Sequence, residues 1–364
     1  MVLVQVFAAN GLFLAGMVPN EIYMQRCIQL AQQAAGWVAP NPMVGAVLVY
    51  QNSIIGEGYH EKFGQAHAEV NCLNAVAEED RHLIHESDLF VSLEPCAHHG
   101  KTPPCADLII QNKIPRVIIG CRDPFPLVNG KGIEKLQAAG VEVHVGLLED
   151  ECRELNKRFF QFYQKHRPYI VLKWAQTRDG KIAHGDYNRA MISGPLTNRL
   201  VHKWRSEEAA ILVGTNTALH DNPSLTVRDW EGAQPIRLVV DMQLRLPENL
   251  HLLDKHWKTI VFNGQKHAEK DQLSWYQLAT DTELVHQLEM ALYQLKIQSV
   301  LVEGGAKLLQ SFIDESDWDE ARIITNEKMD LPDGIPAPVL HNQEMVEEFS
   351  LDGDRIQVFR NKIS

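Results

Sequence analysis

The chain has 364 residues, a length typical of two domains, and its 45% hydrophobic and 23% charged residues are an ordinary globular balance. A formal net charge of −12 argues against a protein that binds nucleic acid through bulk charge, although it leaves room for a local basic pocket that holds one phosphate. All six cysteines lie in the first half, and in a long chain without an export signal we expect reduced thiols or metal ligands rather than disulfides.

The N-terminal stretch MVLVQVFAANGLFLAGMVPN is apolar, but no Lys or Arg precedes the apolar run, so the charged start of a signal peptide is missing. We favour a frayed extension or an early start codon, with Met17 as the true start, over an export signal. The run is too short and too interrupted to span a membrane, and no later segment is long enough. We therefore expect a cytoplasmic protein without a membrane partner.

In chain order, the first half predicts alternating helices and strands. A helix over 20–36 would be capped by Asn20 and ended by Gly36. The elements predicted after it are a β-hairpin over 44–60, a helix over 66–79, a strand over 88–93, a helix from Cys105, a strand over 116–121, a helix over 130–139 and a strand over 141–146. Strands separated by helices predict an α/β layer fold with a largely parallel sheet.

A second alternating block begins near Arg167. Its predicted strands and helices are strands over 168–175, 209–215, 236–241, 258–263 and 299–305, with helices over 193–205 and 306–314. The charged, aromatic segment 150–165 is predicted to be a helix that joins the two blocks. We therefore expect one domain at 18–148 and another at 167–364.

Three residues of the first half offer the donors that Zn²⁺ prefers. His67, Cys96 and Cys105 supply one nitrogen and two sulfurs, and three protein ligands leave a fourth position for water. Glu69 completes an H-x-E motif of the kind found in zinc deaminases, where the Glu is a proton shuttle and not a ligand. Zinc would activate the water, and Glu69 would move protons to the ring nitrogen and the leaving ammonia.

Each part of this motif is weak by itself, and the combination carries the prediction. Residues two apart on a helix do not face each other, so the spacing does not show that His67 and Glu69 serve one centre. The alternative hypothesis is a structural zinc knuckle in a binding protein, although structural zinc sites normally have four protein ligands. His98 and His99 are either further ligands or side chains that face solvent or substrate.

The segments APNPMVGAV, GEGYH, HAEV and above all EPCAHHGKTPPC resemble the deaminase half of the bifunctional riboflavin biosynthesis protein family. That family carries a long loop between its zinc cysteines, where other zinc deaminases favour the short C-x-x-C. The resemblance covers about residues 20–146 and implies a cytidine-deaminase-like α/β/α domain.

For the site, this resemblance implies zinc on His67, Cys96 and Cys105, with Glu69 as the acid/base residue. It also implies a substrate contact from Asn41, for which an ordinary turn residue before proline is the alternative. The stretch 98–101 would either contact substrate or merely fill the loop.

The residues of the second half are less specific. The standard G-x-G-x-x-G fingerprint of dinucleotide sites is absent. In LVEGGAKLL, two glycines separate a strand from a helix. These glycines either let a phosphate approach the helix N-terminus or simply form the turn between the strand and the helix. The residues alone favour the simple turn. Arg205 and Arg228 are either solvated surface residues or cations that hold a sugar phosphate.

The segments LKWAQTRDGKIA, ISG, HKWRSEEAAILVGTNTALHDNPSLTVR and VEGGAKL resemble the reductase domain of the same family, over about 167–314. The resemblance implies a dihydrofolate-reductase-like α/β domain that uses NADPH. By motif position it places near the sugar-phosphate substrate the residues Lys173, Arg205, Leu225, Arg228 and Glu303. It places near the cofactor the residues Ala175 (through its backbone), Thr217, Asp221, Gly304, Gly305 and Ala306.

Four of these positions have a plain structural alternative: Lys173 as a strand-edge charge, Thr217 as a helix cap, Asp221 as a turn residue and Leu225 as core. The chain also departs from the family, which commonly has Ser-x-Trp where Arg189 and Met191 stand. We still predict that Arg189 is a substrate-binding residue, because its guanidinium can bind a phosphate. Met191 is kept as a cofactor residue that can pack on a ring but cannot stack like an indole.

Taken together, the resemblance implies an enzyme of riboflavin synthesis that acts twice on a phosphoribosyl pyrimidine. The first domain would hydrolytically deaminate 2,5-diamino-6-(5-phosphoribosylamino)pyrimidin-4-one, and the second would reduce the ribosyl side chain to ribityl with NADPH. The alternative is a cytidine- or tRNA-type deaminase with an unrelated C-terminal domain. The reductase domains of this family usually self-associate, which implies a homo-oligomer. Because Arg189 and Met191 depart from the family pattern, a reductase domain that has lost its activity is a further alternative.

Overall fold

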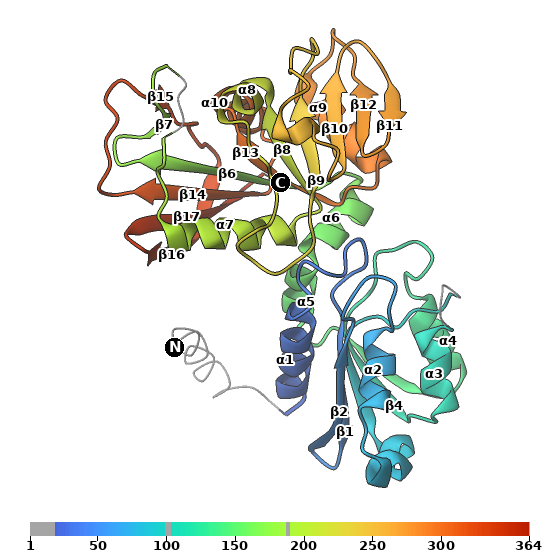
Figure 1. The fold of residues 1–364 in the computed structure, drawn as a ribbon. Coiled ribbons are helices and arrows are strands. Elements are labelled where there is room, and N and C mark those ends of the chain that lie inside the picture. The colour runs from blue at the N-terminus through green and yellow to red at the C-terminus, as the bar shows by residue number, and fades with distance from the viewer. Residues whose placement is uncertain (1–18, 99–102, 187–189, 364) are drawn as a thin grey trace. The chain divides into compact units, whose positions relative to one another are not determined.

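The computed structural model describes residues 19–98, 103–186 and 190–363 of the chain. These residues divide into two compact units, with the boundary between Gln164 and Lys165. Each unit is built around its own β-sheet, with helices packed against it (Figure 1). The apolar stretch before Pro19 lies outside the described residues.

The first unit holds a five-stranded sheet in the order β2-β1-β3-β4-β5. Its strands are β1 (Gly45–Tyr50), β2 (Ser53–Tyr59), β3 (Asp88–Leu93), β4 (Arg116–Cys121) and β5 (Glu142–Val145). Strand β1 is antiparallel to β2 and to β3, whereas β3, β4 and β5 run parallel. The parallel part of this sheet therefore begins at β3, the strand that leads into the cysteine loop.

Because successive side chains of a strand point to opposite faces, this sheet has two cores. Leu89 and Val91 face one core, which is covered by α2 (Ala68–Asn74), α3 (Cys105–Gln111) and α4 (Lys131–Ala138). Phe90 faces the other core, which is covered by α1 (Pro19–Gln32), α5 (Glu149–Leu155) and α6 (Lys157–Lys165). The unit is the α/β/α sandwich that was predicted (Figure 1).

Three predicted helices differ from the observed ones. Helix α1 begins at Pro19, whose fixed φ suits the first helical position, so Asn20 lies inside the helix and does not cap it. The helix predicted over 66–79 is split into α2 and the 3₁₀ helix η2 (Glu78–Glu86). The helix predicted over 150–165 is interrupted at Asn156, whose side chain hydrogen-bonds the backbone of Met43 through both of its polar atoms.

The second unit holds a ten-stranded sheet in the order β11-β12-β10-β9-β8-β13-β6-β14-β17-β16. Its strands are β6 (Tyr169–Thr177), β8 (Ala210–Gly214), β9 (Ile236–Val240), β10 (Thr259–Asn263), β11 (Ala268–Lys270), β12 (Leu273–Gln277), β13 (Ser299–Gly304), β14 (Glu320–Asn326), β16 (Gln343–Leu351) and β17 (Asp354–Asn361). All neighbours from β12 to β14 are parallel, and both edges are antiparallel. A small separate sheet pairs β7 (Lys181–Ala183) with β15 (Ile335–Pro336).

Helices cover both faces of this larger sheet. Helices α9 (Leu284–Gln294) and α10 (Ala306–Asp314) pack on one face, and α8 (Thr215–Asp221) with η3 (His251–Leu253) packs on the other. Helix α7 (Pro195–Glu207) packs through Val201 and Trp204 against β14 and β17. The unit is thus the predicted reductase-type α/β domain, and its last strands complete one edge of the sheet.

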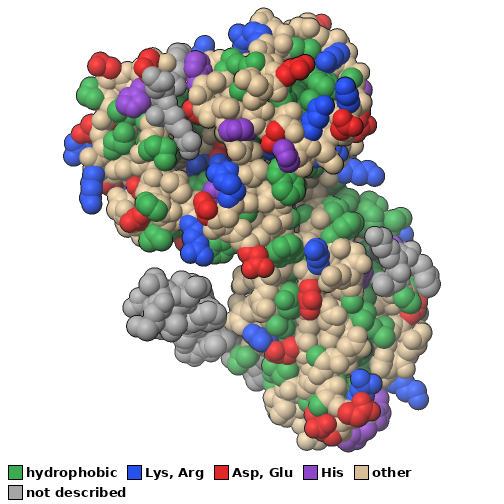
Figure 2. Space-filling view, viewed as in Figure 1, with side chains coloured by type: hydrophobic (Ala, Val, Ile, Leu, Met, Phe, Trp, Pro, Cys, Tyr) green, Lys and Arg blue, Asp and Glu red, His purple; other side chains and the backbone are tan. Residues whose placement is uncertain are grey.

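Acidic and basic side chains are interspersed on the visible face of both units rather than segregated by sign (Figure 2). All six cysteines are free thiols. Within the described ranges, no helix combines the length and the apolar composition that a membrane span requires.

Candidate active sites

The first candidate site lies where α2 begins. His67 precedes this helix with extended backbone (φ −75°, ψ 165°), and Glu69 stands in its first turn. Because His67 is outside the helix, the rule that helical residues two apart point away from each other does not apply. The two side chains can therefore serve one centre, which the spacing alone did not show.

The cysteine loop brings its two sulfurs to the same place. Cys105 is the first residue of α3, and its backbone N–H donates to Cys96 Sγ at 3.3 Å. The Nδ1 atom of His67 lies 3.3 Å from Cys105 Sγ and 3.6 Å from Cys96 Sγ. One ligand atom from each residue lies within 4.8 Å of the others. One imidazole and two thiols fit Zn²⁺, and three protein ligands leave a fourth position open.

Burial and charge set the protonation states in this site. The Cys105 thiol, which hydrogen-bonds Cys96, lowers the pKa of Cys96, and the bond from His67 acts in the same direction. Glu69 is only 3% exposed, and burial raises the pKa of its carboxyl, with a further contribution from the nearby charge of Cys96. A buried carboxyl with a raised pKa can hold a proton and release it again, as an acid/base residue must.

Glu94 is a residue of the loop motif that the sequence did not single out. It is 4% exposed, and its carboxylate accepts hydrogen bonds from a set of backbone N–H groups: Gly130 at 2.9 Å, Gly132 at 3.0 Å, Asp123 at 3.3 Å and Ile133 at 3.4 Å. A Cβ atom on Gly132 would lie 2.0 Å from the carbonyl oxygen of Pro95, so this approach requires glycine. Glu94 therefore fixes the start of the cysteine loop against the N-terminus of α4.

Asn41 is held by a second residue that the sequence did not single out. Asn41 Nδ2 lies 3.1 Å from His60 Nε2, and His60 Nδ1 lies 2.9 Å from the carbonyl oxygen of Ala66. A carbonyl only accepts, so Nδ1 of His60 carries the proton and Nε2 accepts from the Asn41 amide. The GYH segment that contains His60 was the available signal. The ring of His98 packs edge-on against Phe125, and 99–101 lie outside the described residues.

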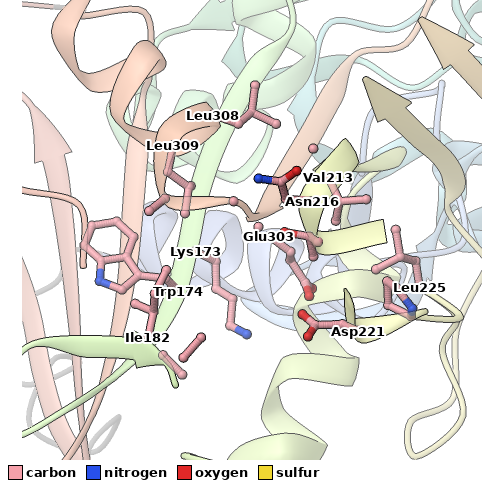
Figure 3. A pocket seen from close by; sticks show the side chains of 18 of the residues that line it. Lys173, Trp174, Ile182, Val213, Asn216, Asp221, Leu225, Glu303, Leu308 and Leu309 are labelled. Atoms are coloured by element: carbon pink, nitrogen blue, oxygen red, sulfur yellow. The ribbon is translucent and has the colours of Figure 1, made fainter. Parts of the chain in front are cut away.

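The second candidate site is a cavity of about 810 Å³ in the second unit (Figure 3). It lies at the carboxyl ends of β8, β9 and β13, where open α/β sheets bind ligands, and it extends along β6. It is lined by every described residue that the sequence placed in the reductase site: Lys173, Ala175, Met191, Arg205, Thr217, Asp221, Leu225, Arg228, Glu303, Gly304, Gly305 and Ala306. Arg189 lies outside the described residues.

Glu303 and Arg205 form a buried ion pair in this cavity. The guanidinium of Arg205 donates to both carboxylate oxygens, at 2.7 and 2.6 Å, and the Glu303 side chain is 5% exposed. Burial alone would raise the pKa of Glu303, but the charges of Arg205 and Lys173 outweigh it and hold that pKa at about 2. Arg205 is therefore no solvated surface residue, which corrects one of the readings open from the sequence.

Arg228 and Leu225 follow α8 on the loop that closes this part of the cavity. Arg228 donates from its side chain to Thr226 Oγ1 at 2.9 Å and from its backbone to Nδ1 of His202 at 3.2 Å. Leu225 is 3% exposed, packs in the core and lines the cavity as well. His202 was missed, although it lies three residues before Arg205 and thus on the same face of α7.

Gly304, the last residue of β13, and Gly305 form a tight turn against α8. A Cβ atom on Gly304 would lie 2.8 Å from Cγ2 of Thr217, and Gly305 has φ 84°, which favours glycine. Helix α10 starts directly after them at Ala306. This cradle leaves room for a phosphate to approach backbone N–H groups, so it fits a dinucleotide cofactor. Met191 is 66% exposed at the wall of the same cavity.

Comparisons with known proteins cover both units. A family model described as the cytidine and deoxycytidylate deaminase zinc-binding region matches residues 17–121. A second model, the RibD C-terminal domain, matches residues 168–329. The two matches fall on the halves that hold the two candidate sites.

Whole-chain relatives agree with these matches. Curated riboflavin biosynthesis proteins RibD include one from Aquifex aeolicus, 41% identical over 82% of this chain and 85% of the relative. Another, from Escherichia coli, is 34% identical over 83% of this chain and 86% of its own. A crystal structure from Thermotoga maritima, described as a diaminohydroxyphosphoribosylaminopyrimidine deaminase/5-amino-6-(5-phosphoribosylamino)uracil reductase, superposes with a TM-score of 0.85. It is 36% identical and covers 94% of this chain and 99% of its own.

The two family models include the cysteine loop and the glycine turn, and the relatives are matched over most of their own length. The chain therefore belongs to the RibD family of riboflavin biosynthesis proteins, with a zinc-binding deaminase domain and a reductase domain in one polypeptide.

Proposed function

We propose that the first unit deaminates 2,5-diamino-6-(5-phosphoribosylamino)pyrimidin-4-one and that the second unit reduces the ribosyl side chain of the product with NADPH. The observation that carries the proposal is the convergence of His67, Cys96 and Cys105 beside the buried Glu69. The name of the Thermotoga maritima relative supports the same substrate and the same order of steps. We place the deaminase domain at 18–148 and the reductase domain at 167–364.

In the deaminase site, His67, Cys96 and Cys105 would hold zinc, which when bound makes water a good nucleophile at neutral pH. Glu69 accepts a proton from the attacking water and returns protons to the ring nitrogen and to the departing amino group. A C–O bond forms, the exocyclic C–N bond breaks, and ammonia leaves. Asn41, oriented by His60, offers its side-chain carbonyl oxygen as an acceptor for the pyrimidine.

In the reductase site, the cofactor supplies a hydride when it is bound. Lys173 on β6 and Glu303 on the adjacent strand β13 both project into the cavity (Figure 3). The Arg205 guanidinium donates hydrogen bonds to Glu303, and the Arg228 guanidinium donates one to Thr226. These bonds orient both guanidinium groups before a phosphate binds. Opening of the ribose to an imine gives C1′ the electrophilic character that a hydride requires.

The proposal extends to the setting of the enzyme. Six free thiols suit a reducing compartment, and we assign the chain to the cytoplasm. Its acidic balance speaks for a small-molecule substrate rather than a nucleic acid. We further propose a homo-oligomer that forms through the reductase domain.

The test is metal analysis of the purified full chain together with a two-step assay. We expect one zinc per chain, and release of ammonia followed by oxidation of one NADPH for each substrate consumed. Cytidine and an adenosine-containing RNA serve as competing substrates. Turnover of cytidine, with no ammonia from the diaminopyrimidine phosphate, would contradict the proposal and support a cytidine-type deaminase.

A further inference from the structure

A buried histidine lies between the helix that carries Arg205 and the loop that carries Arg228. His202 stands on α7 three residues before Arg205, is 5% exposed and lines the reductase cavity. Its Nδ1 lies 3.2 Å from the backbone nitrogen of Arg228, and its Nε2 lies 3.3 Å from Oδ2 of Asp229. Both ring nitrogens therefore contact the loop between α8 and β9, so this side chain acts on the loop.

These two contacts require the neutral form of the ring. A backbone N–H only donates, so Nδ1 of His202 accepts from Arg228, and Nε2 carries the proton that faces Asp229. Burial lowers the pKa of His202, and the charges of Arg205 and Arg228 act in the same direction. Asp229 and Glu303 act in the opposite direction but do not outweigh them. At neutral pH, Nδ1 therefore stays without a proton and remains an acceptor.

The same loop holds the two arginines near each other. The carbonyl oxygen of Thr226 accepts from Arg205 Nη1 at 3.4 Å, and its Oγ1 accepts from Arg228 Nη1 at 2.9 Å. The side chain of Gln234 accepts from the backbone N–H of Val227 at 2.9 Å and donates to the Val227 carbonyl at 2.7 Å. These bonds fix residues 226 and 227, and the bond to His202 fixes the backbone of Arg228 itself.

Two guanidinium groups at one end of a cavity repel each other, and a phosphate between them would relieve the repulsion. Each guanidinium has N–H groups beyond those used in the bonds to Thr226 and Glu303. Cations that are already oriented lose little freedom when they bind a phosphate. The strength of phosphate binding should therefore depend on how firmly Arg228 is held beside Arg205.

We propose that His202 is a positioning residue of the reductase. Through its bond from the Arg228 backbone, it holds the Arg228 guanidinium beside Arg205, so that the two together bind the phosphate of the substrate. This inference rests on the proposed function, which assigns both arginines to a sugar phosphate. It deepens that function by naming a residue that controls phosphate recognition through Arg228.

The experiment compares His202→Leu with His202→Asn in the full chain. Leucine offers no acceptor, whereas the side-chain carbonyl of asparagine can stand where Nδ1 stands and accept the same N–H. The assay is reduction of the deaminated substrate with its 5′-phosphate and of the same compound without it. The ratio of the two kcat/KM values measures recognition of the phosphate.

Two further variants complete the experiment. Arg228→Gln tests directly whether this arginine binds the phosphate. His286→Leu, an exposed change on α9, is the control for loss of a histidine. If His202→Leu does not fold, His202→Ser takes its place, because serine is polar but too short to reach the Arg228 backbone.

We expect His202→Leu to raise the KM for the phosphorylated substrate about 5- to 50-fold, because a backbone N–H loses its acceptor and the guanidinium loses its position. The kcat, the KM for NADPH and the kcat/KM for the phosphate-free compound should change less than about twofold, since only phosphate binding is affected. His202→Asn should recover most of the loss, and His286→Leu should match the unaltered enzyme.

The results that contradict the inference differ from those that contradict its basis. If His202→Leu lowers kcat/KM equally with and without the phosphate, His202 serves only the packing of α7. The inference also fails if His202→Asn is no better than His202→Leu. If Arg228→Gln leaves the preference for the phosphorylated substrate intact, the error lies in the proposed function, which assigned Arg228 to the phosphate.

Discussion

Each unit contains a buried glutamate at the centre of its site, and the two carboxyls are tuned in opposite directions. For Glu69, burial raises the pKa, and the nearby charge of Cys96 raises it further. The Glu303 side chain is 5% exposed, but Arg205 and Lys173 hold its pKa at about 2. Similar burial therefore produces a proton carrier in one site and a permanent anion in the other, because the neighbouring charges decide the outcome.

The two sites also differ in how they are assembled. The first site comes from the start of α2 and one loop that ends at α3, and three of its side chains could hold a metal ion. The second draws on residues spread from Lys173 to Ala306 and uses the carboxyl ends of parallel strands. If this comparison is right, each site can be disabled without loss of the other.

The largest effect is expected from removing a metal ligand. Cys105→Ala should abolish bound zinc and reduce deamination below detection, because the remaining two ligands hold zinc poorly. Reduction of the already deaminated substrate should be unchanged. Zinc content and both activities are measured, with Cys27→Ala, a buried thiol outside the cluster, as control. If Cys105→Ala also abolished the reductase activity, the hypothesis that the two sites work independently would be contradicted.

Glu69→Gln should lower the kcat of deamination by about 10²- to 10⁴-fold, the usual contribution of acid/base catalysis. Zinc content and the reductase activity should be retained, since Glu69 is not a ligand. Glu79→Gln, on the exposed face of η2, is the matched control. Deamination within tenfold of the unaltered enzyme would mean that zinc here is structural.

Arg205→Met leaves Glu303 buried without its bidentate partner. We expect the free energy of unfolding of the second unit to fall by about 3–5 kcal/mol, with loss of reduction and retention of deamination. Adding Glu303→Gln to the same chain should restore much of the stability but not the reduction. Calorimetry of each variant distinguishes an unpaired buried charge from a simple packing defect.

The same pair predicts a pH dependence. The folded-state pKa of Glu303, about 2, lies below its ordinary value of 4.5. The folded state thus favours the ionised form, and this stabilisation is complete above pH 4.5 and is lost as the pH falls toward 2. In Arg205→Met the dependence over this range should shrink, which denaturant titrations at several pH values will show.

The smallest effect concerns Glu289, a buried glutamate that lies outside both sites. Glu289 on α9 is 7% exposed, and its Oε1 has no hydrogen bond within the described residues, since Arg167 NH1 stands 3.8 Å away. Burial, with the charge of Asp317, raises the pKa of Glu289 to about 7. The folded state therefore binds the proton more tightly, and stability falls as the pH rises from 4.5 to 7.

Glu289→Gln should remove that penalty. We expect a gain on the order of 1–3 kcal/mol in the free energy of unfolding at pH 8 and no gain at pH 4, with both activities unchanged. The measurement sharpens the comparison of Glu69 and Glu303, since a raised pKa would then be shown to occur without any catalytic role. A loss of stability at pH 8 would show that Glu289 is ionised and paired in the folded state.

Local patterns in the sequence were enough for much of the fold. The predicted strands over 88–93 and 116–121 and the predicted helix over 306–314 coincide with β3, β4 and α10. These segments are short apolar runs or follow paired glycines, so their ends are marked by neighbours in sequence. Helix α1 was placed less well, because Pro19 took over the start that Asn20 was expected to cap.

Partners far apart in sequence were not predictable. The sequence analysis named Arg205 and Glu303 separately but did not predict that they form an ion pair. Arg205 lies on α7 and Glu303 on β13, so their contact depends on the order of the strands in the sheet. Asn156 holds the backbone of Met43 in the same way, and no spacing rule connects them. The cavity itself is a property of strand ends brought together, so it appears only when the sheet is assembled.

The Glu94 carboxylate has a consequence for the order in which a growing chain becomes an enzyme. All three zinc ligands have been synthesised once Cys105 is made, but the backbone amides that anchor Glu94 lie as far on as Ile133. Until that segment has emerged and folded, the Glu94 carboxylate has the backbone N–H of Asp123 but lacks those of Gly130, Gly132 and Ile133. A nascent chain that stops short of Gly130 therefore carries every metal ligand but lacks most of the bonds that hold Glu94 at the start of the cysteine loop.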